Sequence, residues 1–256
     1  MTSILGPEGL AALGELLRGE PLMAFDFDGT LAPLVSHPHA ARVPASVSRR
    51  LDRLAKRLPV AIVTGRAVAD ARTRLGFEPR YVVGSHGAED TGPAETLGGR
   101  RAALDGVRRQ LHARAAALAA LGVLVEDKDL SIALHFRAAR DREVAREAIM
   151  RALTPADPGL RIFGGKLVVN VMPAGAPDKA EAVLGLVARS GADRAFFAGD
   201  DVNDEPVFAA APAHWVTVRV GRDDPHTRAR FVLDGTAGMT LLLDRMLAEL
   251  AGASAA

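Results

Sequence analysis

The chain of 256 residues contains no cysteine. Its absence excludes disulfide bonds, thiolate catalysis and cysteine-ligated zinc sites. No apolar run approaches the roughly 20 residues that a membrane-spanning helix needs, and no basic leader followed by an apolar stretch opens the chain as in a secretory signal. We therefore expect a cytoplasmic protein without a membrane partner.

A large excess of charge is also missing, because acidic and basic residues nearly cancel at a net charge of +1. The balance gives no electrostatic case for binding nucleic acid, and the dispersed arginines make a nucleic-acid binder the least favoured alternative. Lysine is scarce, and the only lysines are Lys56, Lys128, Lys166 and Lys179. A lysine that persists in an arginine-rich chain indicates a use for its compact ammonium group.

Apolar runs alternate with helical spacing in the first third of the chain. The runs 22–26, 60–63 and 81–83 are typical of buried parallel strands. Their alternation with helices predicts an α/β fold with a doubly wound, mostly parallel, Rossmann-like sheet. In such sheets ligands bind beyond the carboxyl ends of the strands, and each of these runs is followed there by a polar segment.

The pattern changes after about residue 89. We expect one long helix over 101–121, a hairpin with a polar tip over 126–131, a helix over 139–153, and a second hairpin turning at Gly164-Gly165. This order of elements is typical of antiparallel α+β structure.

An apolar run at 195–198 indicates that the α/β pattern then resumes. The sequence thus predicts a discontinuous core of residues 1–88 and 174–256 and an inserted α+β cap domain of residues 89–173.

The segment Asp26-Phe27-Asp28-Gly29-Thr30 ends the first apolar run. A turn at Gly29 can aim both carboxylates into one pocket, as the nucleophile and the acid/base of phosphoryl transfer require. The alternative is a plain strand end made of turn formers.

A second acidic segment, with Asp200, Asp201, Asp204 and Glu205, follows the run 195–198. Two acidic sites at neighbouring strand ends repel each other unless a cation lies between them, and ligands that offer only oxygen favour a hard ion such as Mg²⁺. The alternative is a helix start rich in acidic residues, which the first acidic segment makes less attractive.

Thr64-Gly65-Arg66 offers a hydroxyl and N–H groups for a phosphoryl oxygen at the end of the second run, although a strand-to-helix turn explains it equally well. Lys179 lies at an expected helix start, where a cation is unfavourable against the helix dipole. Its ammonium can neutralise charge on a nucleophile and a phosphoryl group.

In their order along the chain these four segments resemble the motifs of the haloacid dehalogenase superfamily of phosphatases. The resemblance implies that Asp26 attacks phosphorus and that Asp28 protonates the leaving oxygen and then activates water. It also implies phosphoryl binding by Thr64 and Lys179. The implied Mg²⁺ ligands are the Asp26 carboxylate, the Asp28 backbone carbonyl and Asp200. Asp201 and Asp204 are implied to orient the ion without binding it directly.

The segments 84–89, 125–131, 135–137 and 165–168 resemble the trehalose-6-phosphate phosphatase family. The resemblance implies that Glu126 and Lys128 contact the sugar from a hairpin tip, and Arg137 fits the same site. The alternative for Glu126 and Lys128 is a solvated turn. The alternative for Lys166 is an exposed turn residue, and for His86 it is a hydrogen bond that orders its loop. The predicted substrate-binding residues are Asp26, Asp28, Gly29, Thr64, Arg66, His86, Glu126, Lys128, Lys166 and Asn170.

The chain departs from the family at Asn170, where a Glu is usual, and at Ala180 and Asn203. Asn can still donate and accept hydrogen bonds. We predict a monomeric or weakly oligomeric Mg²⁺-dependent phosphatase of trehalose 6-phosphate. The alternatives are a phosphatase of another glycosyl phosphate, such as glucosylglycerol or sucrose phosphate, and a catalytically silent sugar-phosphate binding protein.

Overall fold

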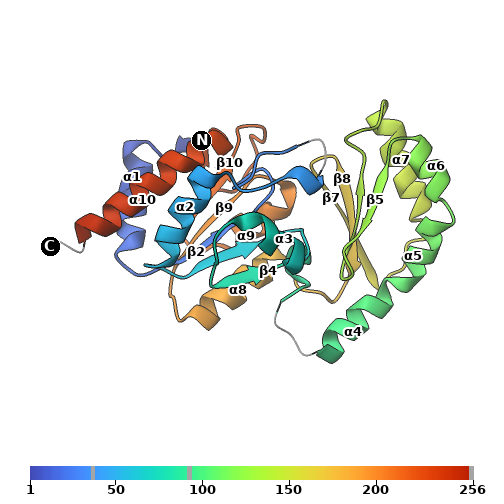
Figure 1. Cartoon of the computed structure of the whole chain (residues 1–256), viewed down its shortest axis with the longest axis horizontal. Coiled ribbons are helices and arrows are strands. Elements are labelled where there is room, and N and C mark those ends of the chain that lie inside the picture. The colour runs from blue at the N-terminus through green and yellow to red at the C-terminus, as the bar shows by residue number, and fades with distance from the viewer. Residues whose placement is uncertain (36–37, 91–93, 254–256) are drawn as a thin grey trace. The chain divides into compact units, whose positions relative to one another are not determined.

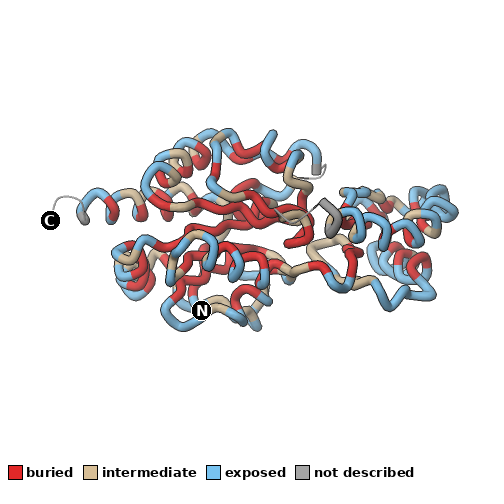
Figure 2. The backbone as a smooth tube through the Cα atoms, turned by 90° about the horizontal axis from the view of Figure 1, so that it is seen from below, coloured by how far each residue is buried: buried red, intermediate tan, exposed pale blue. Residues whose placement is uncertain are grey.

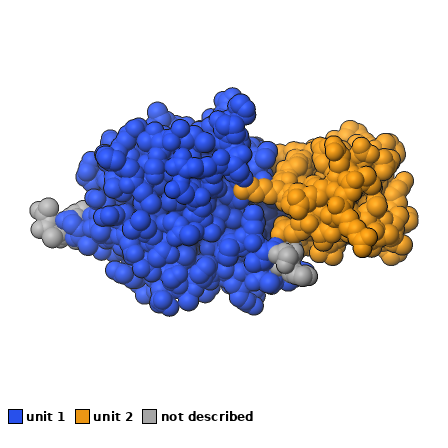
Figure 3. Space-filling view, turned by 90° about the horizontal axis from the view of Figure 1, so that it is seen from above, with its two compact units in different colours: residues 1–87, 178–256 blue, residues 88–177 orange. Residues whose placement is uncertain are grey.

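The computed structural model describes residues 1–35, 38–90 and 94–253. The chain divides into two compact units, one of residues 1–87 and 178–256 and one of residues 88–177 (Figure 3). Within the described residues, none of the helices has the length and apolar character needed to cross a bilayer.

A seven-stranded parallel sheet forms the centre of the larger unit, in the order β1-β11-β10-β9-β2-β3-β4. Its strands are β1 Thr2–Ser3, β2 Leu22–Phe25, β3 Val60–Val63, β4 Tyr81–Val83, β9 Ala195–Gly199, β10 Val216–Val220 and β11 Phe231–Leu233. The chain leaves β2 toward β3 and leaves β9 toward β10, on opposite sides. The β2–β9 pair is therefore the switch point at which ligands of such sheets bind, and the predicted doubly wound fold is confirmed.

Helices cover both faces of this sheet (Figure 1). One layer consists of α1 Pro7–Leu17, α2 Ala45–Ala55, α3 Val68–Leu75 and α10 Met239–Ala253, and the other of α8 Lys179–Ser190 and α9 Glu205–Ala210. Along β2, Met23 and Phe25 pack into the first layer, whereas Leu22 and Ala24 pack against the second. The strands lie buried between exposed outer helix surfaces (Figure 2), which is why they read as unbroken apolar runs.

The smaller unit has a four-stranded antiparallel sheet in the order β5-β6-β8-β7. Its strands are β5 Leu124–Asp127, β6 Ile132–His135, β7 Leu160–Gly165 and β8 Val168–Pro173. The helices α5 Asp105–His112, α6 Ala115–Ala120 and α7 Arg142–Ala152 lie on one side of it (Figure 1). Ile132, Leu134, Val169 and Val171 pack toward those helices in a core of their own. The helix α4 Ala94–Ala103 packs Leu97 against Met172 and Leu130 in a separate cluster.

The expected single helix over 101–121 is wrong, because the chain forms α4, α5 and α6 there. A straight helix of that length would extend about 30 Å, whereas four strands span only about 15 Å from edge to edge. The breaks keep Leu111 and Leu118 on the same small core. Arg108 Nη1 donates to the Arg101 carbonyl oxygen at 2.8 Å, so a side chain satisfies backbone at the end of α4. Tertiary packing here overrides helix propensity.

The hairpin turns also differ from the prediction. Glu126 lies within β5, opposite Ala133, and the tip is shorter, closed by a hydrogen bond from Lys128 N to Ser131 O at 2.8 Å. Gly164 and Gly165 are part of β7, not of a turn, and the chain reverses at Lys166 and Leu167. The later turn adds two residue pairs to the β7–β8 ladder, and backbone hydrogen bonds outweigh the usual turn preference of glycine.

Candidate active site

The carboxyl ends of β2 and β9 bring the two acidic segments together. Asp26 directly follows β2 and its N–H donates to the Ala198 carbonyl oxygen of β9 at 2.8 Å. Asp200 directly follows β9, and Asp26, Asp200 and Asp204 are all buried. Carboxylates that lie far apart in the sequence therefore meet at the switch point of the sheet.

Lys179 joins two of these carboxylates. Its Nζ donates to Asp26 Oδ1 at 2.8 Å and to Asp204 Oδ1 at 2.7 Å, with only 2% of the side chain exposed. Burial alone would lower the pKa of the ammonium group, but Asp204 and Asp26 outweigh burial and raise it. Asp178, which caps the same helix end, also offsets the unfavourable position of a cation there.

Asp204 also organises the loop that carries Asp200. Its second oxygen, Oδ2, accepts the backbone N–H groups of Asp200 and Asp201, each at 2.9 Å. Asp201 caps the short 3₁₀ turn Val202–Asp204 (η3) by accepting the N–H of Val202 at 2.7 Å. The backbone geometry of this loop is thus fixed by its own carboxylates.

Gly29 lets the two acidic segments approach closely. Its φ is +84°, and a Cβ at this position would overlap the Asp200 carboxylate. Thr30 Oγ1 donates to Asp200 Oδ1 at 3.4 Å, so the Thr30 hydroxyl serves a carboxylate in this structure. Glycine is required here by both the backbone conformation and the space.

Among the described residues, the buried cluster brings together three carboxylates and the ammonium group of Lys179. One oxygen from each of Asp26, Asp200 and Asp204 lies within 4.8 Å of the others. Burial raises the pKa of the Asp26 carboxyl well above its usual range, Lys179 opposes the rise, and Asp204 and Asp200 add to it. A divalent cation would remove the excess negative charge, and an all-oxygen donor set suits such an ion. The residues present therefore fit a metal ion.

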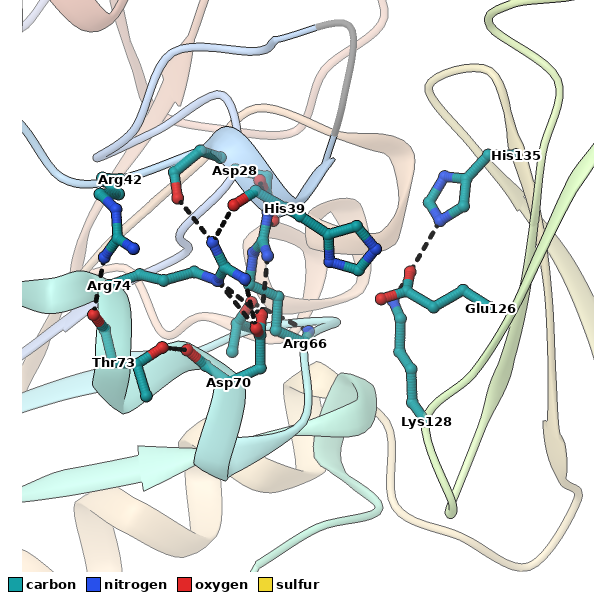
Figure 4. A network of polar contacts seen from close by, with 12 residues as sticks. Asp28, His39, Arg42, Arg66, Asp70, Thr73, Arg74, Glu126, Lys128 and His135 are labelled. Atoms are coloured by element: carbon teal, nitrogen blue, oxygen red, sulfur yellow. Dashed lines mark hydrogen bonds and ion pairs between the residues drawn. The ribbon is translucent and has the colours of Figure 1, made fainter.

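Asp28 belongs to a second network (Figure 4). Arg66 grips both Asp28 oxygens, with Nε and Nη2 each at 2.7 Å, and its Nη1 donates to Asp70 Oδ2 at 2.8 Å. Arg74 approaches Asp70 from the next helical turn, with Nη2 at 2.6 Å from Oδ1. Partial burial works against ionisation of Asp70, but the hydrogen bonds from Arg74 and Arg66 prevail and lower its pKa to about 2.

Thr64 lies at the carboxyl end of β3, on the strand next to Asp26. It is fully buried, its hydroxyl accepts the Arg66 N–H at 3.2 Å, and its carbonyl oxygen accepts the His86 N–H at 2.9 Å. His86 lies in the 3₁₀ turn Ser85–Gly87 (η2) with φ +57°, and its ring occupies space that a side chain on Gly65 would need. Three strand ends thus contribute to one site.

The trehalose-phosphatase family model matches residues 24–234. The chain belongs to this family. It is 34% identical over 271 residues to the trehalose-phosphate phosphatase of Mycobacterium marinum, an alignment that covers 95% of this chain and 66% of that protein. The chain therefore spans just under two thirds of the length of that relative.

Two solved structures of similar fold are described as trehalose-6-phosphate phosphatases. The C-terminal domain of the C. albicans protein matches with a TM-score of 0.80 at 22% identity, over 97% of this chain and 98% of that one. The Aspergillus fumigatus protein in crystal form 3 matches with a TM-score of 0.62 at 25% identity, over 96% and 98%. The family resemblance inferred from the motifs is confirmed.

The predicted sugar contacts Glu126, Lys128, Lys166 and Asn170 lie on the smaller unit. Glu126 Oε2 lies 2.8 Å from His135 Nε2 and 3.6 Å from Lys128 Nζ (Figure 4). The sequence placed His135 in a segment that resembles the family but gave it no role. Ala133 pairs with Glu126 in the β5–β6 ladder, and His135 lies two residues after Ala133. The side chains of Glu126 and His135 therefore lie on one face of the sheet, and this spacing is the signal that the sequence offered.

Asn170 shares that face, because it pairs with Ala133 from the other side. It is 2% exposed, and within the described part of the chain its Nδ2 has no hydrogen-bond partner. Lys166 is a half-buried residue in the β7–β8 turn, and Arg137 is a half-buried residue two positions after β6.

Proposed function

We propose that this chain is a Mg²⁺-dependent phosphatase that converts trehalose 6-phosphate into trehalose and phosphate through an aspartyl-phosphate. The observation that carries the proposal is the buried bond from Lys179 to both Asp26 and Asp204 at the β2–β9 switch point. An ammonium group beside a carboxylate nucleophile stabilises the charge that develops on the phosphoryl group. Membership in the trehalose-phosphatase family supports the same chemistry.

In the first half-reaction we assign the attack on phosphorus to an Asp26 carboxylate oxygen. The phosphorus–oxygen ester bond breaks, and Asp28 gives its proton to the leaving sugar oxygen. In the second half-reaction Asp28 takes a proton from water, whose oxygen attacks phosphorus, so that phosphate leaves and the Asp26 carboxylate is restored. Thr64 and Lys179 hold the phosphoryl oxygens through both steps.

Proton transfer by Asp28 requires a change at Arg66. Both Asp28 oxygens accept from Arg66 in this structure, and an acid must turn one of its oxygens toward the leaving group to donate a proton. We infer that at least one of these bonds opens before Asp28 acts as an acid. Asp70 holds the other side of the guanidinium group and keeps Arg66 near the site.

We assign Mg²⁺ to Asp26, the Asp28 backbone carbonyl and Asp200, with Asp201 and Asp204 orienting these ligands. The ion, when bound, supplies positive charge that neutralises the carboxylates and the phosphoryl group. Asp204 is suited to the supporting role, because its oxygens already accept from Lys179 and from two backbone N–H groups.

We assign sugar recognition to the polar face of the smaller unit's sheet. Glu126 accepts sugar hydroxyl protons, and Lys128 donates to hydroxyl oxygens. Asn170 contributes an amide donor where the family usually has a carboxylate, which also supports the alternative of a different glycosyl phosphate. Further assigned substrate contacts are Gly29, Arg66, His86, Arg137 and Lys166.

The test is a set of initial rates with Mg²⁺ on trehalose 6-phosphate, sucrose phosphate, glucosylglycerol phosphate and p-nitrophenyl phosphate. We expect the highest kcat/KM with trehalose 6-phosphate. A preference for another glycosyl phosphate would overturn the substrate assignment and keep the chemistry. If none of the substrates is hydrolysed in the presence of Mg²⁺, the phosphatase proposal is wrong and the alternative of a catalytically silent sugar-phosphate binding protein stands.

A further inference from the structure

Arg219 is an unusual residue for the strand that carries it. β10 is fully buried along its length, and Arg219 is the only charged residue in it, with 2% of the residue exposed. A guanidinium group is almost never buried so completely unless it is paired. In the sheet Arg219 lies beside Gly199, the last residue of β9, directly before the loop that carries Asp200 and Asp204.

The guanidinium group of Arg219 bonds to both ends of this acidic loop. Its Nη1 donates to Glu205 Oε1 at 3.0 Å and to the Asp201 carbonyl oxygen at 3.4 Å. Its Nη2 donates to Asp223 Oδ1 at 3.3 Å. Lys179 holds Asp204 from one direction, and Arg219 holds the neighbouring residues 201 and 205 from another.

Glu205 extends the connection to the segment between β10 and β11. Its Oε1 accepts from Thr227 Oγ1 at 2.7 Å, and its Oε2 accepts the N–H of Arg228 at 2.9 Å. The carboxylate of Glu205 is therefore fixed by three groups and cannot itself turn toward the cluster without losing them. Its role in this structure is to anchor the acidic loop.

We propose that Arg219 and Glu205 are positioning residues that set the placement of Asp200 and Asp204, and hence the affinity of the cluster for Mg²⁺. This inference rests on the metal site of the proposed function. Residues that hold metal ligands in place without touching the ion commonly change metal affinity about 10-fold or more when they are replaced.

The experiment measures Mg²⁺ binding to the whole chain by calorimetry, with no substrate present. In Arg219→Lys the charge remains but the forked geometry is lost, and in Glu205→Gln the charge is lost but the shape remains. We expect each to weaken Mg²⁺ binding by about 10-fold. The control Arg50→Lys alters a similar two-bond pair, from Arg50 to Asp244 at 2.8 and 2.9 Å, outside the acidic loop, and should bind Mg²⁺ as the parent does.

If Arg219→Lys does not fold, Thr227→Val removes one donor to Glu205 without altering a charge, and a weaker Mg²⁺ affinity is expected there too. Unchanged affinity in the folded variants, whatever their melting temperatures, would overturn the inference and leave the phosphatase proposal standing. Failure of the parent chain to bind Mg²⁺ would overturn the inference and the metal assignment together. A parent that binds Mg²⁺ but does not hydrolyse sugar phosphates would contradict only the proposed function.

Discussion

The carboxylate cluster of the larger unit and the contacts of Glu126 with Lys128 and His135 in the smaller unit differ in how far apart their residues lie in the sequence. Lys179 bonds to Asp26, 153 residues away, and to Asp204, 25 residues away, and all three are buried. Glu126 instead meets Lys128 and His135 of the same hairpin, at the tip of β5 and on β6. The carboxylate cluster is thus fixed by the topology of the whole sheet, whereas the contacts of Glu126, which we propose for sugar binding, depend on one local hairpin.

This difference bears on how each region tolerates a change of side chain. A change in the carboxylate cluster disturbs contacts between several elements at once, but a change on the polar sheet face alters only neighbouring strands. Asn170 departs from the expected family pattern on that face, and Ala180 and Asn203 depart from it beside the cluster, while the carboxylates themselves keep it. The two regions should therefore respond differently to substitution.

Asp26→Asn tests the reacting group most directly and should have the largest effect. Loss of the nucleophile is expected to lower kcat by roughly 10⁴-fold or more on every substrate. The fold should remain, because Asn has the same shape and removes a carboxyl whose burial is unfavourable. Steady-state rates and circular dichroism measure the two effects. Asp52→Asn, in an exposed pair with Lys56, is the control and should keep full activity. Substantial turnover in Asp26→Asn would contradict the mechanism.

Lys179→Met should affect both stability and rate. Removal of the ammonium group leaves three buried carboxylates without their cation, and breaking a buried pair in this way costs about 3–5 kcal/mol. Urea unfolding at neutral pH, without metal, measures the loss. Added Mg²⁺ should restore part of the stability, because at the proposed site it would bind the folded cluster and not the unfolded chain. A stability equal to that of the parent would show that the cluster does not need this charge.

The sequence predicted which strand-end residues lie close together, for a physical reason. Parallel strands end at the same edge, so Asp26, Thr64 and Asp200 could be brought together from strand order alone. Arg219 was missed, although a single arginine in a strand of β-branched residues was a visible signal. The breaks around Leu104 and Ala113 could not be predicted from helix propensity, because they follow from the width of a sheet that forms elsewhere in the chain.

Glu126→Gln tests whether the local hairpin affects only the sugar. Gln keeps the shape but loses the charge, and loss of a charged hydrogen bond should raise the KM for trehalose 6-phosphate by about 10-fold. The rate on p-nitrophenyl phosphate should not change, because that substrate has no sugar. Asp129→Asn, at the exposed tip of the same hairpin, is the matched control. Equal losses on both substrates would show that the hairpin also affects the chemistry.

Asp70→Asn probes an intermediate case, because Arg66, Asp70 and Arg74 are local to one helical segment, yet Arg66 grips Asp28 from another. The pKa of Asp70 is lowered from 3.8 to about 2 in the folded chain, so its ionised form stabilises the fold above pH 4 and that contribution fades as the pH falls toward 2. Since a third of the side chain is exposed, solvent screening reduces the expected loss at pH 7 to about 1 kcal/mol. Urea unfolding at several pH values should show the difference from the parent shrinking below pH 4. A difference that stays constant down to pH 3 would mean that Arg66 and Arg74 do not hold Asp70 in its ionised form, and that Arg66 is anchored by Asp28 alone.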